Sequence, residues 1–346
     1  MSLKTTQSTL QQQTQNVTVP ASQQSKVVLR GINTTASVRA VVQDCLESCD
    51  WQTWIPRDAL VVLKPNLCTH LKEKIAVANT SKAVTEALCE ALLTRTKNVF
   101  IVEADHMRLK TPELFEASGY VEMARQLGVQ LVNLSDSPLV SVPCDPVGKL
   151  DLPRLLLECD ALITLPVLKT HALTYFTGSL KNQWGCVPRF DDRIRFHGRI
   201  TELLCSLHRI LRPKFSLMDG ILAMEGRGPV FGGTRELNVL LASRDCVALD
   251  ATAMRLVGLD PRRCRHVSLA AAQHLGNVAA DHIEVDGQWN KYATQFQPAP
   301  RDWANTAMFY FGRYPWFVKN ILGNDKLYYP VRHLVYLLRR TGVLGG

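Results

Sequence analysis

At 346 residues, with 46% hydrophobic and 21% charged side chains, the chain has the composition of a globular protein long enough to bury a large core. No window approaches the ~20 apolar residues that a membrane-spanning helix needs, so such a helix is not expected. The net charge of +9 favours an anionic partner. Its basic residues are spread along the chain without a zinc-finger, helix-turn-helix or RNA-binding signature, which argues against nucleic acid.

The two ends of the chain differ in composition from its centre. Residues 1–25 are rich in Gln, Thr and Ser and lack the apolar segment of a signal peptide, so we predict a disordered tail on a cytoplasmic protein. Residues 296–346 form a predicted helical extension, basic and aromatic from residue 301 onward. The extension is expected either to cap the sheet or to contact a membrane surface or partner protein peripherally.

Between these ends, residues 26–295 alternate strand and helix signals. Continuous apolar strands separated by amphipathic helices predict an α/β fold, with a mostly parallel sheet covered by helices on both faces. The predicted strands are Val27–Arg30, Ala59–Leu63, Val99–Val102, Gln130–Leu134, Ala161–Leu165, Phe215–Met218 and Leu237–Ala242. The predicted helices are Ser37–Ser48, Ser81–Leu93, Pro112–Leu127, His197–Leu211 and Asp245–Val257.

The ten cysteines do not suggest a disulfide framework or a metal cluster. No Cys-x-x-Cys pair and no closely spaced quartet occurs, which argues against an iron–sulfur cluster. Most are expected to be free, buried small side chains. Cys186 is singled out because it directly follows the turn at Gly185.

Lysine and amide side chains gather where several predicted strands end. Ligands of open α/β sheets bind outside the carboxyl ends of the strands. We therefore expect Lys64, Lys169 and Lys181 to bind a phosphate or carboxylate group, with Asn66 and Asn182 orienting it. A structural salt bridge at a strand end is the alternative for the lysines.

Acid/base and metal-binding candidates follow from the same positions. The acid/base candidates are His171, Lys169, Glu103, Asp219 and Glu225. For His171 the sequence leaves three roles open: metal ligand, base, or core histidine. A divalent metal is also left open, because His171, His197, Asp219 and Glu225 have suitable donor atoms but are widely spaced.

Two further segments have more than one interpretation. Five glycines between Gly220 and Gly233 predict a flexible loop in which Gly226 and Gly228 present backbone amides to an anion, or else a surface hairpin. Asp245 is expected to cap the helix that follows it. Asp250 lies in an apolar run, so its carboxylate is either paired or functional.

These segments resemble a family called domain of unknown function 362. The resemblance runs from about residue 27 to 285, and its most specific parts are the Lys-Thr-His and Gly-Ser-Leu-Lys-Asn segments. The matching pieces are Lys64–Leu67, Glu116–Tyr120, Leu168–His171, Thr177–Asn182 with Gly185, His197, Asp219–Ile221, Glu225–Gly226, Gly228–Pro229 and Ser243–Asp245 with Asp250. The resemblance implies one α/β domain and brings no established reaction. Some relatives carry iron–sulfur segments, from which this chain departs by lacking the cysteine quartet.

The expected function is that of an intracellular enzyme acting on a small anionic substrate, phosphorylated or carboxylated. Two other classes remain open at this point. One is a redox accessory protein that docks an iron–sulfur partner, which predicts a solvent-exposed Cys186 or a bound cluster. The other is a non-enzymatic membrane-surface or scaffold protein that uses residues 301–346.

Overall fold

The computed structural model describes residues 24–33, 37–106 and 109–300, and scattered residues between 307 and 334. Its strands form one ten-stranded sheet and a separate hairpin, β5–β6. The strands are β1 Ser25–Gly31, β2 Val61–Pro65, β3 Val99–Glu103, β4 Gln130–Asn133, β5 Leu139–Cys144, β6 Gly148–Pro153, β7 Ala161–Leu165, β8 Val167–His171, β9 Tyr175–Thr177, β10 Phe215–Glu225, β11 Gly233–Ser243 and β12 Ile283–Asp286.

The strand order in the large sheet is β12-β1-β11-β10-β7-β2-β3-β4. The five strands from β10 to β4 are mutually parallel, whereas β11 runs antiparallel to both β10 and β1. Beyond the end of β7, β8 pairs in parallel with β10, and β9 folds back against β8. The predicted mostly parallel sheet is therefore confirmed.

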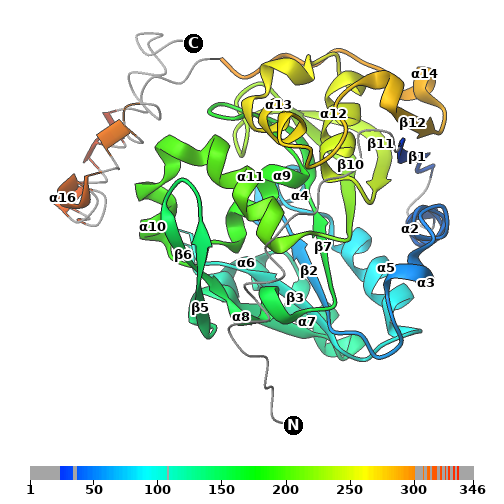
Figure 1. Ribbon diagram of the computed structural model, residues 1–346, viewed down its shortest axis with the longest axis horizontal. Coiled ribbons are helices and arrows are strands. Elements are labelled where there is room, and N and C mark those ends of the chain that lie inside the picture. Colours follow the sequence, from blue (N-terminus) through cyan, green and yellow to red (C-terminus); the bar gives the residue numbers. More distant parts are fainter. Residues whose placement is uncertain are drawn as a thin grey trace.

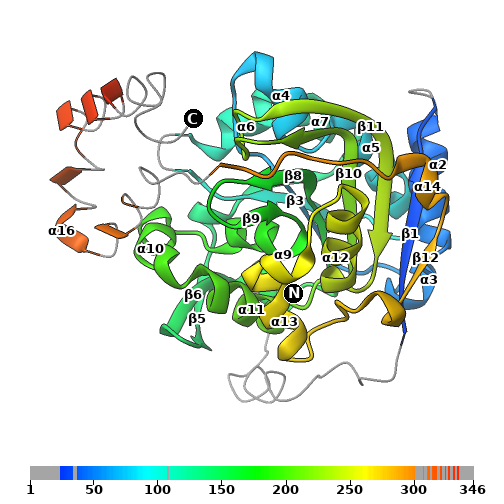
Figure 2. The ribbon, with the colours of Figure 1, turned by 90° about the horizontal axis from the view of Figure 1, so that it is seen from above.

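Helices cover both faces of this sheet, as the layering in Figures 1 and 2 shows. Side chains alternate between the layers along β2: Val61 and Leu63 pack in the same hydrophobic cluster as α5, whereas Val62 packs with α11 on the other face. The helices are α2 Ser37–Glu47, α3 Trp51–Trp54, α4 Lys72–Ala78, α5 Lys82–Leu93, α6 Thr111–Ala117, α7 Tyr120–Leu127, α8 Arg154–Glu158, α9 Ser179–Asn182, α10 Phe190–Arg195, α11 Ile200–Leu211, α12 Cys246–Leu256, α13 Arg265–Ala272, α14 Trp289–Tyr292 and α16 Pro315–Phe317.

Three predicted elements differ in the structure. The helix predicted over Pro112–Leu127 is two helices, because Gly119 has a left-handed φ of 73° that ends one helix and starts the next. The strand predicted to end at Met218 continues to Glu225, with a register shift between Gly220 and Leu222 that the apolar pattern does not show. The supposed glycine loop is accordingly shorter, and it starts at Gly226.

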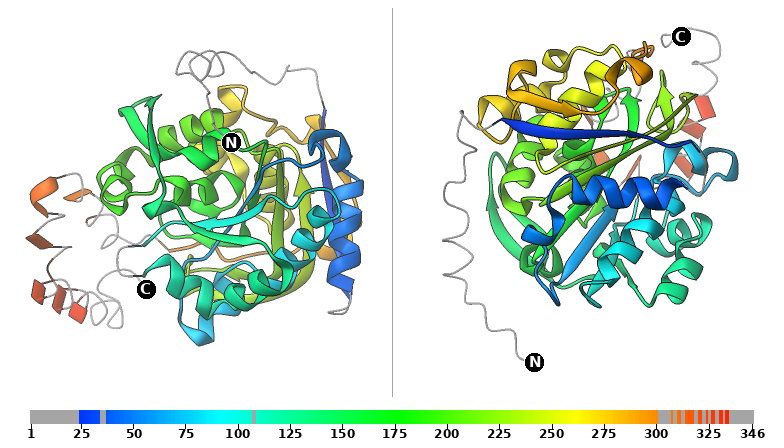
Figure 3. Two further views of the ribbon diagram at one scale, coloured as in Figure 1. Left: turned by 90° about the horizontal axis from the view of Figure 1, so that it is seen from below. Right: turned by 90° about the vertical axis from the view of Figure 1, so that its right-hand side faces the viewer.

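Both ends of the chain are only partly described. Residues 1–23 of the tail predicted over residues 1–25 lie outside the described residues, and the last residue of that range, Ser25, already begins β1. Only part of the predicted extension is described, including α16, which lies at one side of the molecule in Figure 1 and in the left view of Figure 3. Within the described part of the chain, no helix is both long enough and apolar enough to cross a membrane.

Candidate functional site

The carboxyl ends of β2 and β3 form a buried ion pair. Lys64 Nζ lies 2.7 Å from Glu103 Oε2, and both side chains are 2% exposed. The Glu103 carboxylate also accepts hydrogen bonds from the backbone amides of Leu67 and Ala104. Lys64 donates a further bond to the Pro65 carbonyl at 2.7 Å. Lys64 therefore forms a structural salt bridge, the alternative to anion binding considered for the lysines, and the Glu103 carboxylate balances its charge.

The turn at Gly185 packs directly on this pair. A Cβ atom at Gly185 would lie 2.8 Å from Lys64 Nζ and 2.9 Å from Glu103 Oε1. Such distances are too short for any side chain. Close approach thus accounts for the glycine that follows the Lys181–Asn182 segment, and it ties that segment to the ends of β2 and β3.

Lys169, on β8, is fully buried but makes no ion pair with any residue that the structure describes. Its ammonium group donates to Asn66 Oδ1 at 2.6 Å, to the Ala78 carbonyl at 2.7 Å and to Cys68 Sγ at 3.4 Å. These three bonds use all three ammonium protons. Burial lowers the pKa of Lys169. Lys169 therefore holds Asn66 and Cys68 in place and adds an uncompensated positive charge.

Two asparagines link the strand ends. Asn182, at the end of α9, donates to the Lys64 carbonyl and to Thr164 Oγ1, each at 2.8 Å. Its own Oδ1 lies 3.4 Å from Asn66 Nδ2, which makes a weak contact. Asn66 and Asn182 thus connect β2, β7, β8 and α9. The predicted convergence of Lys64, Asn66, Lys169 and Asn182 is found in the structure.

Lys181 differs from the other two lysines. It is partly buried, and among the described residues none accepts a hydrogen bond from its Nζ atom. Burial, together with the nearby charges of Lys169 and Arg193, lowers the pKa of Lys181 to about 7. A desolvated ammonium group without an acceptor is energetically costly. Lys181 is therefore the lysine that an incoming anion would stabilise.

Neutral histidines surround Lys181. Burial and the charge of Lys181 lower the pKa values of His197 and His266 to about 3 each, and the pKa of His171 also falls well below its usual value. His106, where burial is again the main cause and Arg193 the next, has a pKa of about 3. At neutral pH these rings offer hydrogen bonds without adding charge.

The tautomer of His171 follows from its local contacts. Nδ1 accepts hydrogen bonds from the backbone amides of Leu173 and Thr174, at 3.1 and 3.3 Å. The proton of the neutral ring must then lie on Nε2. In this arrangement Nε2 is a hydrogen-bond donor, so the role of base predicted for His171 is not available to it at that atom.

The carboxylates of β10 are engaged within the protein. Asp219 accepts bonds from the backbone amides of Ser81 and Ile221, at 2.8 and 3.0 Å, and burial raises its pKa. Glu225 pairs with Arg235 at 3.1 Å. Within the described residues, no three His, Cys, Asp or Glu side chains come together to hold a metal ion, so the four metal candidates do not form such a group.

The glycine segment after β10 packs on β8. The Gly226 carbonyl accepts a bond from Thr170 Oγ1 at 2.8 Å, and the Gly228 carbonyl accepts one from the Ala172 amide at 3.2 Å. A Cβ atom at Gly228 would lie 1.9 Å from the Thr170 carbonyl oxygen. Their amides are engaged as well, because Gly226 N–H donates to the Gln297 carbonyl at 2.9 Å and Gly228 N–H donates to the Gly226 carbonyl at 2.8 Å. The expectation that these two amides face an anion is therefore wrong, since each N–H is used within the protein.

Asp250 positions the Lys181 segment. Its carboxylate accepts bonds from the Ser179 and Leu180 amides at 2.6 and 3.0 Å, which satisfies the first turn of α9. Burial raises the pKa of Asp250 to about 7. Asp245, in turn, caps α12 as expected, through the Val247 and Ala248 amides. Of the two readings of Asp250, pairing is the one that the contacts support.

Sequence reasoning overlooked two residues of this site. Arg193 on α10 is 5% exposed and donates to the backbone carbonyl of Asp105. Cys68 lies beside Lys169 and is partly exposed. The position of Cys68 two residues after Asn66 was an available signal, whereas Arg193 is one of several arginines in its segment. Cys186, which had been singled out, is fully buried, and burial raises its thiol pKa to about 12.

Two surface hollows of the described residues lie away from these side chains. Two hollows of about 310 and 180 Å³ are lined by residues of α12, β12 and the segment that follows α13. None of the strand-end residues lines them. The candidate site is therefore defined by the Lys181 ammonium and the polar groups around it, since unpaired buried charge is a more specific sign of a ligand than an open apolar hollow.

Comparison with known proteins relates the segment that contains this site to other sequences. A family model described as "Domain of unknown function (DUF362)" matches residues 61–255. A thylakoid-associated protein from Synechocystis is 32% identical over 168 residues, which cover 46% of this chain and 51% of that protein. The chain thus spans about half the length of this curated relative.

Two solved structures are similar at lower identity. A protein from Thermotoga maritima is 15% identical, with a TM-score of 0.39, over 70% of this chain and 60% of its own. The lactate racemase apoprotein from Thermoanaerobacterium thermosaccharolyticum is 15% identical, with a TM-score of 0.43, over 63% of this chain and 54% of its own. At these values neither structure carries an argument about the chemistry of this chain.

Proposed function

Since the chain belongs to the DUF362 family, and the matched residues 61–255 contain the whole strand-end site, we propose that it is an enzyme acting on a small substrate with a phosphate or carboxylate group. The observation that carries the proposal is the Lys181 ammonium, which has no hydrogen-bond acceptor among the described residues and lies near the charges of Lys169 and Arg193. An anionic group bound there would relieve the desolvation and the mutual repulsion of these cations.

The neighbouring side chains take distinct roles in this proposal. Lys181 binds the anion, and with a pKa of about 7 it also exchanges a proton near neutral pH, as a general acid or base must. His171 donates from Nε2 to a substrate oxygen. Lys169 donates a hydrogen bond to Asn66, and Asn182 donates one to the Lys64 carbonyl at the end of β2. The two asparagines therefore hold the strand ends in position and do not themselves bind the anion in this proposal. No step of this scheme depends on a metal ion.

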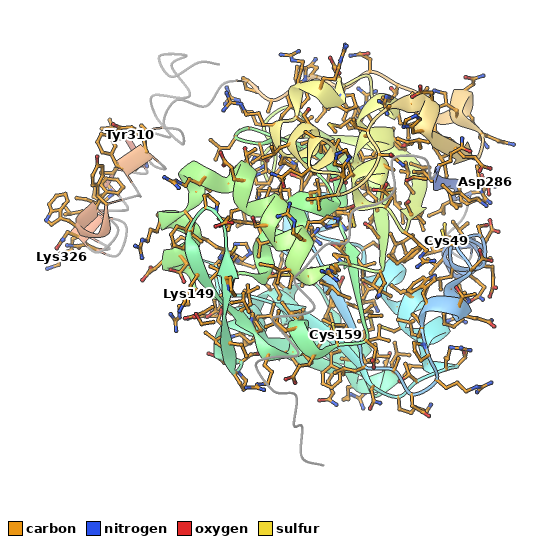
Figure 4. The ribbon with its side chains drawn as sticks, in the orientation of Figure 1. Cys49, Lys149, Cys159, Asp286, Tyr310 and Lys326 are labelled. Atoms are coloured by element: carbon orange, nitrogen blue, oxygen red, sulfur yellow. The ribbon has the colours of Figure 1, made fainter. Side chains whose placement is uncertain are left out.

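A thermal-shift titration tests the proposal. Inorganic phosphate and sulfate should raise the melting temperature of the wild-type protein in a saturable way at constant ionic strength. Lys181→Met should lose this response. The matched control is Lys149→Met, which removes an exposed lysine on the β5–β6 hairpin, at the lower left in Figure 4. Equal responses of the wild type and both variants would refute an anion site at Lys181.

A second candidate function rests on the C-terminal extension. Large apolar side chains are exposed there, among them Tyr310, Phe311, Trp316 and Leu334, which are 48–67% exposed. Tyr310 and Lys326 project from this segment in Figure 4. Exposed aromatic residues among basic ones suit a membrane surface with anionic lipids, and the curated relative is described as thylakoid-associated. Removal of residues 301–346 should then abolish sedimentation with anionic vesicles.

The redox accessory function has less support. Of its two expected signs, an exposed Cys186 or a bound cluster, the first is not met, because the Cys186 thiol is fully buried. Iron analysis and a visible absorption spectrum of the purified protein test this function. Bound iron together with absorption of visible light would favour the redox accessory function over the enzyme.

A further inference from the structure

Arg193 is a second buried cation for which the described residues supply no carboxylate partner. Its side chain is 5% exposed, and its buried Nε–H has no hydrogen-bond acceptor in that same part of the chain. Nη2 donates to the Asp105 carbonyl oxygen, and the guanidinium lies 5.7 Å from the centre of the Phe190 ring. Burial is the main cause of a lowered pKa for this guanidinium. Buried N–H groups of a charged side chain are normally paired, so an unfilled donor here points to a missing acceptor.

The nearby carboxylates do not supply that acceptor. Glu103 and Asp105 are close enough to favour the charged form of Arg193. Each, however, has its own cation: Lys64 at 2.7 Å from Glu103, and Lys110 at 2.7 Å from Asp105. Among the residues that the structure describes, five cations therefore share two carboxylates around this sheet edge, and the three without a carboxylate partner are Lys169, Lys181 and Arg193.

We infer that the ligand carries two negative charges and that Arg193 binds it together with Lys181, an inference that rests on the proposed anion site. Of these three cations, a monoanion would leave two uncompensated. A dianion matches the charges of Lys181 and Arg193 and leaves only Lys169, whose ammonium protons are already bonded within the protein. The guanidinium of Arg193 also offers directed donors that a lysine lacks, which suits the oxygens of phosphate or of a carboxylate.

One more unsatisfied group lies beside these cations. Thr177 Oγ1 is buried and finds no hydrogen-bond partner in the described part of the chain. Thr177 lies directly opposite Lys169 in the β8–β9 pairing, so the two side chains project from the same face. An unused hydroxyl at this edge provides a further hydrogen bond for a ligand oxygen. The substrate class that follows is a phosphate monoester or a dicarboxylate, which share the dianionic headgroup.

Matched anions that differ by one charge test this inference. Sulfate and methanesulfonate are both tetrahedral at sulfur and differ by the replacement of one charged oxygen with a methyl group. Malonate and propionate form the corresponding carboxylate pair. Calorimetric titrations at constant ionic strength and about pH 6.5, where Lys181 is mostly charged, should show at least one dianion binding about tenfold or more tightly than its monoanionic counterpart. That preference should fall to about threefold or less in Arg193→Met and persist in Lys149→Met.

The possible outcomes distinguish the dianion inference from the proposed anion site. Equal affinity for dianions and monoanions would overturn the dianion inference and leave the proposed anion site standing, whereas no anion binding at all would refute both. An Arg193→Met protein that folds and keeps the full preference would overturn the role of Arg193. Should that variant fail to fold, the wild-type comparison and Arg193→Lys still decide the question. If only sulfate binds more tightly than its monoanionic counterpart, the ligand is of the phosphate type. If only malonate binds more tightly than propionate, the ligand is a dicarboxylate.

Discussion

The titration of Lys181 makes anion affinity depend on pH in a calculable way. Only the ammonium form attracts an anion, and with a pKa of about 7 roughly half of the ligand-free protein carries it at pH 7. At pH 9 the charged fraction is about one in a hundred, so sulfate affinity should fall by about fiftyfold between these two values. Sulfate itself does not titrate in this range, so the change reports on the protein.

Isothermal titration calorimetry from about pH 6 to 9 measures this slope. Lys181→Arg keeps a charge that does not titrate, so its sulfate affinity should be nearly constant over the range. Wild-type titrations in buffers of different ionisation enthalpy should also show proton uptake on binding above pH 7. A wild-type affinity that changes by less than about threefold, or a Lys181→Arg variant with the same slope, would refute the assignment of the titration to Lys181.

Three further predictions concern the support of the site. Lys64→Met leaves the Glu103 carboxylate buried without its cation and should lower the free energy of unfolding by about 3–5 kcal/mol in denaturant titrations; a loss below about 1 kcal/mol would contradict the ion-pair argument. Gly185→Ala should cost about 1–3 kcal/mol, because its Cβ would lie 2.8 Å from Lys64, whereas Gly198→Ala, with open space around its Cβ, should be nearly neutral. Burial raises the pKa of Asp250 from 3.8 to about 7, so the folded protein binds more protons than the unfolded chain between these values. Stability should therefore fall as pH rises through this window, by up to ~1.4 kcal/mol per unit, and Asp250→Asn should remove that slope in urea unfolding; an unchanged slope would assign it to another group.

The fold was largely predictable because its pattern is repeated. Apolar strands buried on both faces alternate with amphipathic helices, and this alternation leaves a parallel sheet as the fold class. The differences fall where the local pattern is weak. Gly119 splits one predicted helix, and β10 extends past Asp219 through residues whose pairing with β11 is irregular. Such features depend on backbone dihedrals and on long-range pairing, which a periodicity does not record.

The sequence predicted where the candidate site lies in the fold, but it predicted only some of the residues that form it. Parallel strands end at one edge of a sheet, so Lys64, Asn66, Glu103 and Lys169 were expected to meet there. Arg193 was missed because α10 is a short helix in a segment with four arginines, and nothing local distinguishes the one that turns inward. Packing of α10 against the loop after β3 makes that selection, through the contact between Arg193 and the Asp105 carbonyl.

The sequence by itself determined that three lysines would gather at the strand ends, since each follows or lies within an apolar strand or its turn. Only the tertiary structure decided what each lysine does. Lys64 meets Glu103, 39 residues away, and is neutralised. Lys169 donates a hydrogen bond to Asn66, 103 residues away in the sequence, and all of its ammonium protons are bonded within the protein. Lys181 meets no acceptor among the described residues. Identical side chains thus acquire different charges and roles because strand register and loop packing, not local sequence, set which acceptors lie within hydrogen-bond distance.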